Sequence, residues 1–212
     1  MSGGADSVDR SSPTRAEILD AAAKIIVSGG YAACTMRAVA ERVKIKAGSL
    51  YYHFRSKDDI IEEILNSGIA ALLDQVGSRL GQLPANASFK ERVVVAVEAH
   101  LACMIGGETG HMNVYEHLPP VLKRRSRKMR DTYAGLWFEL FTFGVEQKEV
   151  DRDLDLTLFV PYFLGGLNRV PEWFRPRKAK SSDVAAMAAE TLLHGVLAGK
   201  TVRTSAASRK AA

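Results

Sequence analysis

The 212-residue chain has little of what marks several large classes of protein. Its two cysteines, Cys34 and Cys103, form no Cys-x-x-Cys pair and belong to no cysteine–histidine cluster, so the sequence predicts neither a disulfide framework nor a zinc site. No apolar run approaches the ~20 residues that span a bilayer, and the first ten residues lack the apolar core of a signal peptide. We therefore expect a cytoplasmic protein with no membrane partner, whose cysteines fill small apolar spaces.

Catalytic signatures are also missing. The sequence contains no Gly-x-Ser-x-Gly, His-Glu-x-x-His or Gly-x-Gly-x-x-Gly motif. His111 and His117, with Glu108 and Glu116 nearby, lack the i, i+4 spacing of helical metal ligands. We predict that the protein is not an enzyme and has no catalytic residue, metal or cofactor. The rival is an enzyme acting on acyl-CoA, which a turnover assay would detect.

Helical periodicity is abundant, whereas no stretch alternates like a strand and no repeat occurs. Apolar residues make up 47% of the chain and recur at i, i+3 and i+4 spacing. Thr14 with Glu17, Ser56 with Asp59 and Ser88 with Glu91 form capping boxes. The pattern predicts an all-α fold with helices over about 14–28, 35–43, 47–54, 57–80, 88–104, 109–117 and 119–148, followed by one that begins at Asp155 and a last one that begins at Ser182 and Asp183.

Positive charge is concentrated in one segment, Thr35–Lys57. It holds six bases against one acid, Glu41, a net of +5 that equals the formal charge of the whole chain. Such a concentration is expected where a protein neutralises phosphates and releases counterions. The segment reads as a capped helix, a turn of a few residues and a second short helix, which is the outline of a helix-turn-helix.

This segment resembles the DNA-binding signature of the TetR family of one-component transcriptional regulators. The resemblance covers residues 12–72 and rests on Thr35, Val39, Ala40, Gly48–Phe54, Ser56 and Lys57, and upstream on Arg15, Ile18, Leu19, Ala21, Ala22, Gly30 and Tyr31. It implies an N-terminal three-helix domain with its motif at 35–54, whose last helix enters the major groove. An architectural, nonspecific DNA-binding protein is the alternative, which competitor DNA would remove from an operator.

The segment's side chains divide between core and DNA. Leu50 and Phe54 point inward with Val39 and Val43, so the remaining faces are free to contact DNA. We assign base contacts to Lys46, Ser49 and Tyr52, assisted by Arg37, and phosphate contacts to Thr35, Tyr51, His53 and Lys57, with Ala47 and Gly48 at the helix N-terminus. For Tyr51 a place in the core is an equal alternative.

Two positions depart from the family pattern. Lys44 stands in the turn where glycine is common, and Lys46 stands where serine usually caps the third helix. A lysine in a left-handed turn is strained, and loss of a serine cap costs about 1 kcal/mol. The extra positive charge offsets these costs when DNA is bound.

Residues 73–200 are predicted to form a helical ligand-binding and dimerisation domain. Residues 1–11 and 201–212, at the two ends of the chain, are predicted to be flexible tails. The helix from Lys57 to Leu80 is the expected lever between ligand and DNA. Gly165 and Gly166 permit close helix approach, and Ala185 and Ala188 give the last helix a similar small face. These faces suggest a four-helix dimer interface, although intrachain packing is the alternative.

The stretch Leu164–Asn168 followed by Pro171–Pro176 resembles the C-terminal domains of TetR-type repressors of fatty-acid and sterol catabolism. Arg169 stands where tryptophan is usual, and Phe174 replaces tyrosine. The resemblance implies a homodimer released from a palindromic DNA operator by an acyl-CoA. The alternative is a regulator that responds to a non-CoA aromatic or lipophilic compound.

Candidate effector-binding residues are large apolar side chains with two polar ones among them. They are Met104, Tyr115, Leu118, Trp137, Phe141, Phe163 and Trp173, with His100 and Asn168 supplying polar orientation. Plain core packing is the more common fate of such a set. The basic run Lys123–Arg130 is predicted to be a solvated helix face, with an anionic ligand group as the alternative.

Overall fold

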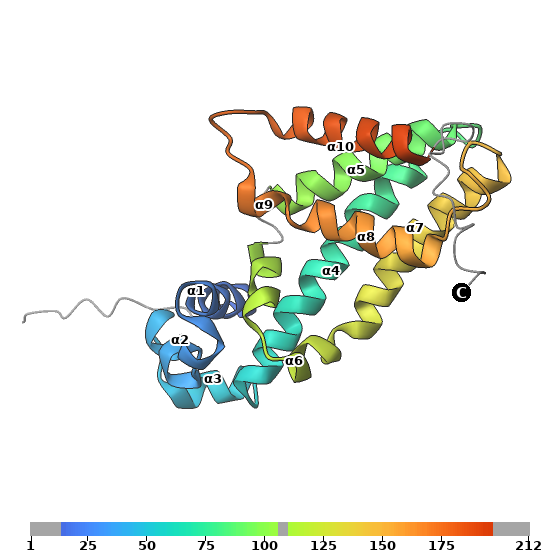
Figure 1. Cartoon of the computed structure of the whole chain (residues 1–212). Coiled ribbons are helices and arrows are strands. Elements are labelled where there is room, and N and C mark those ends of the chain that lie inside the picture. The colour runs from blue at the N-terminus through green and yellow to red at the C-terminus, as the bar shows by residue number, and fades with distance from the viewer. Residues whose placement is uncertain (1–13, 106–109, 197–212) are drawn as a thin grey trace, which may run out of the picture. The chain divides into compact units, whose positions relative to one another are not determined.

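A computed structural model describes residues 14–105 and 110–196, and all regular elements in these ranges are helices (Figure 1). The predicted tails at 1–11 and 201–212 lie outside them. The helices are α1 (Arg15–Ala33), α2 (Met36–Arg42), α3 (Ala47–His53), α4 (Lys57–Gly81), α5 (Phe89–Ile105), the 3₁₀ helix η1 (Gly110–His117), α6 (Pro120–Arg125), α7 (Arg127–Glu146), α8 (Leu156–Asn168), α9 (Val170–Trp173) and α10 (Ser181–Val196). None of these helices is both long and apolar enough to cross a membrane.

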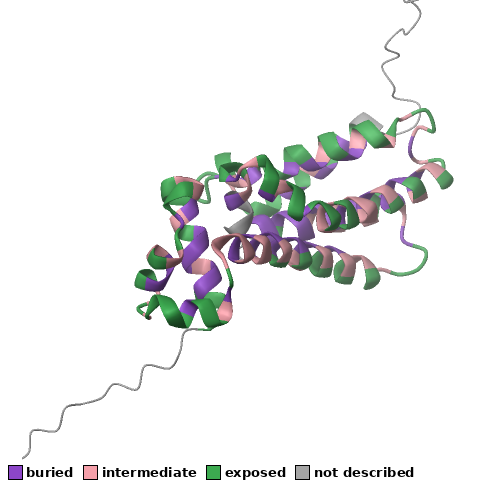
Figure 2. Ribbon diagram, turned by 90° about the horizontal axis from the view of Figure 1, so that it is seen from below, coloured by how far each residue is buried: buried purple, intermediate pink, exposed green. Residues whose placement is uncertain are grey.

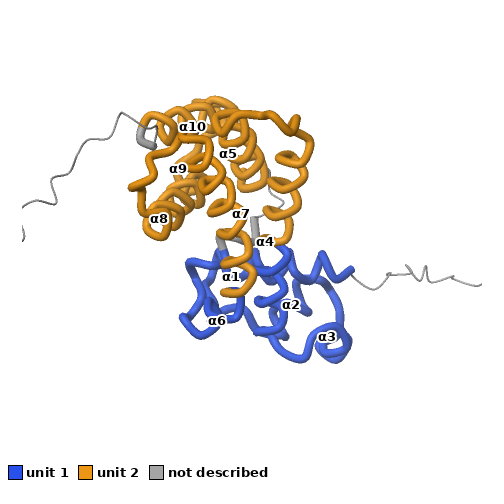
Figure 3. Tube along the Cα trace, turned by 90° about the vertical axis from the view of Figure 1, so that its right-hand side faces the viewer, with its two compact units in different colours: residues 1–67, 111–126 blue, residues 68–110, 127–212 orange. Residues whose placement is uncertain are grey.

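The chain forms two compact units, which Figure 3 shows in different colours. Unit 1 contains residues 1–67 and 111–126, and unit 2 contains residues 68–110 and 127–212. The family resemblance placed the domain boundary at residue 72, and sequence periodicity did not assign 111–126 to the first unit. It reports which face of a helix is apolar but not which partner covers that face.

The predicted helix-turn-helix lies in unit 1, after α1. Thr14 and Glu17 make the predicted capping box of α1, and Gly30 adopts a positive φ of 78° at the kink near its end. Thr35 caps α2 by accepting a hydrogen bond from the Ala38 amide at 3.1 Å. Leu50 and Phe54 are buried with Val39, as their spacing predicted, so the short α3 is held by its apolar side.

The segment 111–126 completes the core of unit 1. Val114, Leu118 and Leu122 are buried in the same cluster as the apolar residues of α1 to α4. The sequence prediction of one helix over 119–148 is wrong, because the chain turns at Ser126 between α6 and α7. Ser126 is fully buried, and its hydroxyl donates a hydrogen bond to the Lys123 carbonyl. This side-chain bond satisfies a backbone carbonyl at the point where the helix is interrupted.

Helix α4 is continuous over 25 residues, close to its predicted extent. Ser56 caps it by accepting a hydrogen bond from the Asp59 amide. Ile60, Ile61 and Ile64 are buried in the unit 1 core, while Leu72 and Val76, further along the helix, are buried in unit 2. One helix therefore supplies core residues to both units.

Unit 2 is a bundle of α5, α7, α8, α9 and α10 around an aromatic interior. The buried faces of its helices are purple in Figure 2. Helix α10 packs along α5, and α5 also contacts α7. Gly144 of α7 lets the buried ring of Phe89 and the side chain of Val150 approach closely, because an added Cβ would lie 2.6 Å from each. Asp155 caps α8, as predicted.

Candidate DNA-binding surface and effector site

Helix α3 presents a strongly exposed outer face opposite its buried side. Tyr52 is 91% exposed and Tyr51 55%, whereas Leu50 is fully buried. Lys46, Ala47, Gly48 and Ser49 are all exposed at the N-terminal end of the helix. Lys46 occupies the N-cap position without a side-chain cap bond. Backbone N–H groups at this end are therefore available to a phosphate or a base edge.

The other predicted DNA contacts are exposed to different degrees. The hydroxyl of Thr35 accepts the α2 cap bond, so its own proton remains free to be donated. Arg37 is exposed and pairs with Glu41 at 2.8 Å, an interaction it must share or exchange to reach DNA. Lys57 is half-buried, with its Nζ 3.7 Å from the centroid of the Tyr31 ring. The half-buried His53 ring stands edge-on to Tyr52.

The predicted effector residues do not form one cluster. His100, Met104, Trp137 and Phe141 are buried in unit 2, and Phe163 contacts the rings of Trp137 and Phe141 at centroid distances of 5.6 and 6.3 Å. Tyr115 and Leu118 lie in unit 1, the former under Lys123 and the latter in the core. Asn168 and Trp173 are exposed, Trp173 by 51%.

His100 is the polar member of the buried cluster in unit 2. Its Nδ1 lies 2.7 Å from the Tyr133 hydroxyl, and their rings stack. Burial lowers the pKa of His100 to about 3, because the charged imidazolium would lose its hydration. Burial likewise raises the pKa of Tyr133. Both side chains are therefore neutral at physiological pH, which suits an uncharged ligand group better than an ion.

An apolar groove of about 660 Å³ runs along α8, α9 and α10 of unit 2. Tyr162, Trp173 and Met187 line it and are 81%, 51% and 54% exposed, and Leu158 of α8 is 70% exposed. A Cβ added at Gly165 or Gly166 in this wall would meet no atom within 4 Å. The two glycines are therefore not needed for packing within the chain, and the face is open to another surface.

Comparison with known protein families identifies the family to which the chain belongs. Residues 18–64 match the bacterial regulatory proteins of the tetR family, and residues 86–196 match the tetracyclin repressor-like C-terminal domain. The chain belongs to the TetR family. It is thus a DNA-binding transcriptional regulator, and α2 and α3 are the helix-turn-helix of a TetR-family protein.

Individual TetR-family relatives resemble most of the chain. The transcriptional repressor KstR2 of Rhodococcus jostii is 28% identical over 188 residues, which cover 86% of this chain and 90% of that protein. The fatty acid degradation regulator FadR of Bacillus halodurans superposes with a TM-score of 0.74 at 20% identity, covering 88% and 98% of the two chains. FadR of Bacillus subtilis, solved in complex with stearoyl-CoA, gives 0.73 at 18% identity, covering 86% and 100%.

Sequence reasoning missed a clamp that joins α1 to the end of α3 and to α4 in this TetR-family chain. Arg15 of α1 forms a two-pronged ion pair with Glu63 of α4 and donates a hydrogen bond to the His53 carbonyl at the end of α3. Its guanidinium also lies 4.2 Å from the centroid of the Phe54 ring. Arg15 thus joins three helices. The basic residue was visible in the sequence, but its partners lie 38 and 48 positions away.

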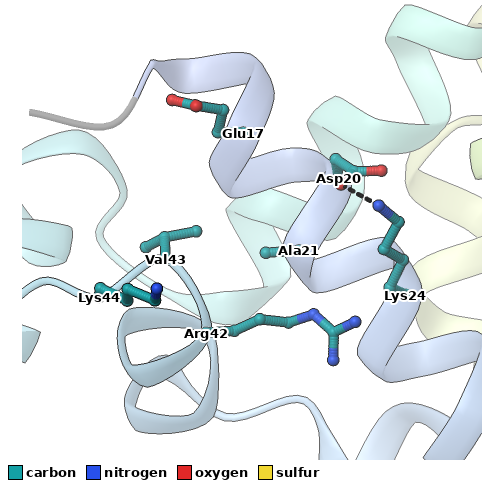
Figure 4. A pocket seen from close by; sticks show the side chains of 7 residues that line it. All are labelled: Glu17, Asp20, Ala21, Lys24, Arg42, Val43 and Lys44. Atoms are coloured by element: carbon teal, nitrogen blue, oxygen red, sulfur yellow. Dashed lines mark ion pairs between the residues drawn. The ribbon is translucent and has the colours of Figure 1, made fainter.

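A mixed-charge hollow of about 320 Å³ lies between α1 and the end of α2 (Figure 4). Asp20 and Lys24 of α1 pair at 2.7 Å on one wall, and Arg42 extends across the hollow from the other. Lys44, at the rim, has a φ of 60°, which confirms the left-handed turn expected there. Charges of both signs make this hollow unsuited to a lipophilic effector.

The basic run Lys123–Arg130 is largely engaged with neighbouring side chains. Arg125 pairs with Glu62 of α4 at 3.3 Å, and Lys123 lies over the Tyr115 ring. Within α7, Arg127 pairs with Asp131 at 3.6 Å. These ion pairs are between exposed side chains and favour the predicted solvated helix face over a dedicated anion site.

Proposed function

We propose that this chain is a homodimeric TetR-type repressor that a hydrophobic effector, of the acyl-CoA class, releases from a palindromic operator. The observation that carries the proposal is the α3 surface, on which Tyr52 is 91% exposed beside the exposed Lys46 and Ser49. A large aromatic side chain projecting from a recognition helix is unfavourable in water and useful against base edges and sugars. We place DNA binding in residues 12–72 and effector binding and dimerisation in residues 73–200.

Residue roles follow from where the side chains lie. Lys46, Ser49 and Tyr52 contact bases, with Arg37 joining them after exchanging Glu41 for DNA. Thr35, Tyr51, His53 and Lys57 contact phosphates, and the N–H groups at Ala47 and Gly48 cap a phosphate at the start of α3. These residues are exposed or half-buried, so DNA reaches them without unfolding the domain.

The effector class is supported by two kinds of observation. The interior of unit 2 is lined by aromatic side chains, among which His100 and Trp137 supply polar atoms. A relative covering 86% of the chain was solved with stearoyl-CoA. Residues His100, Met104, Trp137, Phe141 and Phe163 are the part of the predicted set that we retain for the acyl group.

Release requires that effector binding alter the DNA-reading unit, and two segments of the chain connect the two units covalently. Helix α4 supplies core residues to both, and segment 111–126 belongs to unit 1 although the chain on either side belongs to unit 2. An acyl-CoA that binds one arrangement of these segments more tightly shifts the population away from the DNA-bound form. The free energy of this shift can be no larger than the difference between the effector's binding free energies for the two forms.

The proposed function also implies where the protein acts and that it does not change its effector chemically. An operator-binding regulator acts in the cytoplasm, where bacterial DNA lies. Catalysis has no place in the mechanism, since effector binding and conformational selection suffice. Incubation with acyl-CoA should leave the thioester intact, which thin-layer or mass analysis of the recovered effector would show.

The deciding experiment is a gel shift on the DNA upstream of the protein's own gene, with excess competitor DNA. We expect a sharp complex that isovaleryl-CoA, stearoyl-CoA or a steroid-derived CoA thioester releases. A specific complex that no thioester disturbs would retain the repressor and favour the non-CoA lipophilic effector. Loss of the complex on adding competitor would point instead to nonspecific DNA binding.

Two exposed substitutions sharpen that experiment. Lys46→Ala and Tyr52→Ala should each weaken operator binding about 10- to 100-fold, because one good base contact contributes about 1–3 kcal/mol. Neither should change the melting temperature, since both side chains are exposed. Arg152→Ala, an exposed unit 2 charge, is the control and should bind as the wild type does. Operator protection by both α3 variants would refute the assignment of α3.

A further inference from the structure

Three side chains of unit 2 form a buried polar cluster within an aromatic interior. His100 comes from α5, and Tyr133 and Trp137 come from one face of α7, one turn apart. His100 and Trp137 are fully buried, and their rings meet edge-on with centroids 6.1 Å apart. The Tyr133 hydroxyl fills one side of the cluster through its 2.7 Å bond to Nδ1 of His100.

Two nitrogen atoms of this cluster have no hydrogen-bond partner. They are Nε2 of His100 and Nε1 of Trp137. The indole N–H lies near enough to the Tyr133 hydroxyl to influence its pKa, but without the geometry of a hydrogen bond. A buried polar atom left unpaired costs about 1–3 kcal/mol, and such atoms are rare in folded proteins. Two in one cluster indicate a group that a ligand supplies.

The chemistry of that group follows from the donors. When Tyr133 donates its hydroxyl proton to Nδ1, the neutral imidazole carries its own proton on Nε2, and the indole nitrogen can only donate. The ligand atom is then an acceptor that faces two N–H groups. Burial lowers the His100 pKa, so the imidazole ring is neutral. A buried carboxylate would need a positive charge nearby to offset its loss of hydration, whereas a neutral carbonyl oxygen needs only hydrogen-bond donors.

We propose that His100 and Trp137 bind the thioester carbonyl oxygen of the effector's acyl group through these two N–H donors. This inference rests on the acyl-CoA effector proposed above and adds the point at which the acyl group is recognised. The rings of Phe141 and Phe163, next to Trp137, contact the hydrocarbon that follows the carbonyl. Tyr133 is a positioning residue, because it acts by fixing the His100 tautomer.

The test compares two ligands that differ by that oxygen. Stearoyl-CoA and its thioether analogue S-octadecyl-CoA are titrated into the full chain by calorimetry, with isovaleryl-CoA and S-isopentyl-CoA as a short pair. The wild type should bind the thioester at least tenfold more tightly than the matching thioether. Trp137→Phe should reduce that preference to threefold or less. Phe143→Leu, elsewhere on α7, is the control and should keep the full preference.

The outcomes separate this inference from the function it rests on. Equal affinity of the wild type for thioester and thioether, or an unchanged preference in Trp137→Phe, would overturn carbonyl recognition and leave the acyl-CoA effector standing. If the wild type binds none of the four ligands, the acyl-CoA effector itself is rejected. If Trp137→Phe does not fold, ¹⁵N-histidine spectra of the wild type decide: the Nε2–H signal of His100 should shift with the thioester and not with the thioether.

Discussion

His100 couples the stability of the protein to pH through its burial. Its pKa is lowered from 6.5 to about 3 in the folded protein. Between these values the unfolded chain binds a proton at this residue that the folded chain does not, so protonation favours unfolding. The stability is complete above pH 6.5 and declines as the pH falls toward 3, by about 1.4 kcal/mol per pH unit at most.

We expect the free energy of unfolding of the wild type to fall by about 2–3 kcal/mol more than that of His100→Gln between pH 6.5 and 4.5. Urea titrations at several pH values measure this difference in slope. His194→Gln, which changes an exposed histidine of α10, is the control and should follow the wild-type slope. Parallel slopes for the wild type and His100→Gln would show that burial does not hold His100 neutral.

Two lysines with left-handed backbones provide a second test at single residues. Lys44 has a φ of 60° in the α2–α3 turn, and Lys148 has a φ of 61° after α7. Glycine adopts this conformation without strain, so Lys44→Gly and Lys148→Gly should each stabilise the protein by about 1 kcal/mol, or about 2–4 °C in melting temperature. Only Lys44→Gly should also weaken operator binding and lower its salt dependence. Destabilisation by both would contradict the strain argument.

Helix α7 contains two glycines whose surroundings differ. An added Cβ at Gly144 would lie 2.6 Å from the side chains of Phe89 and Val150, whereas at Gly135 nothing lies within 4 Å. Phe89 is fully buried against Phe141, so its ring cannot move away cheaply. Gly144→Ala should therefore destabilise the protein by about 1–3 kcal/mol, while Gly135→Ala should stabilise it by about 0.5–1 kcal/mol. Denaturant titration of the pair checks both signs, and a neutral or stabilising Gly144→Ala would refute the close packing.

The helices were predictable to the extent that their signals are local. The caps at Thr35, Ser56 and Ser88 lie where the sequence predicted them, because capping depends on residues within one turn. The break at Ser126 was missed, since neither glycine nor proline marks it. The exposed face of α3 followed from its period. The assignment of Leu118 and Trp137 to different units did not, because periodicity carries no information on which helices pack together.

At the scale of the whole molecule, the open apolar face of unit 2 connects fold to function. Leu158, Tyr162 and Met187 are exposed on α8 and α10, next to glycines that no intrachain packing requires. A two-fold operator presents its half-sites about one helical turn of DNA apart, so two linked recognition helices are needed to bind both. Pairing of this face with its copy in a second chain would supply the link and remove the apolar groove from water.

A charged residue on that face should separate the subunits without disturbing either one. We expect the double variant Tyr162→Asp, Met187→Asp to be monomeric in light scattering and to lose operator binding, although its α3 surface is intact. Its melting temperature changes little at low concentration, because neither side chain is buried within the chain. Val27→Asp, an equally apolar-to-acid change at an exposed position of α1, is the control and should remain dimeric. A double variant that stays dimeric would move the interface to another surface. A monomer that binds the operator as tightly as the wild type would instead show that DNA recognition does not depend on the dimer.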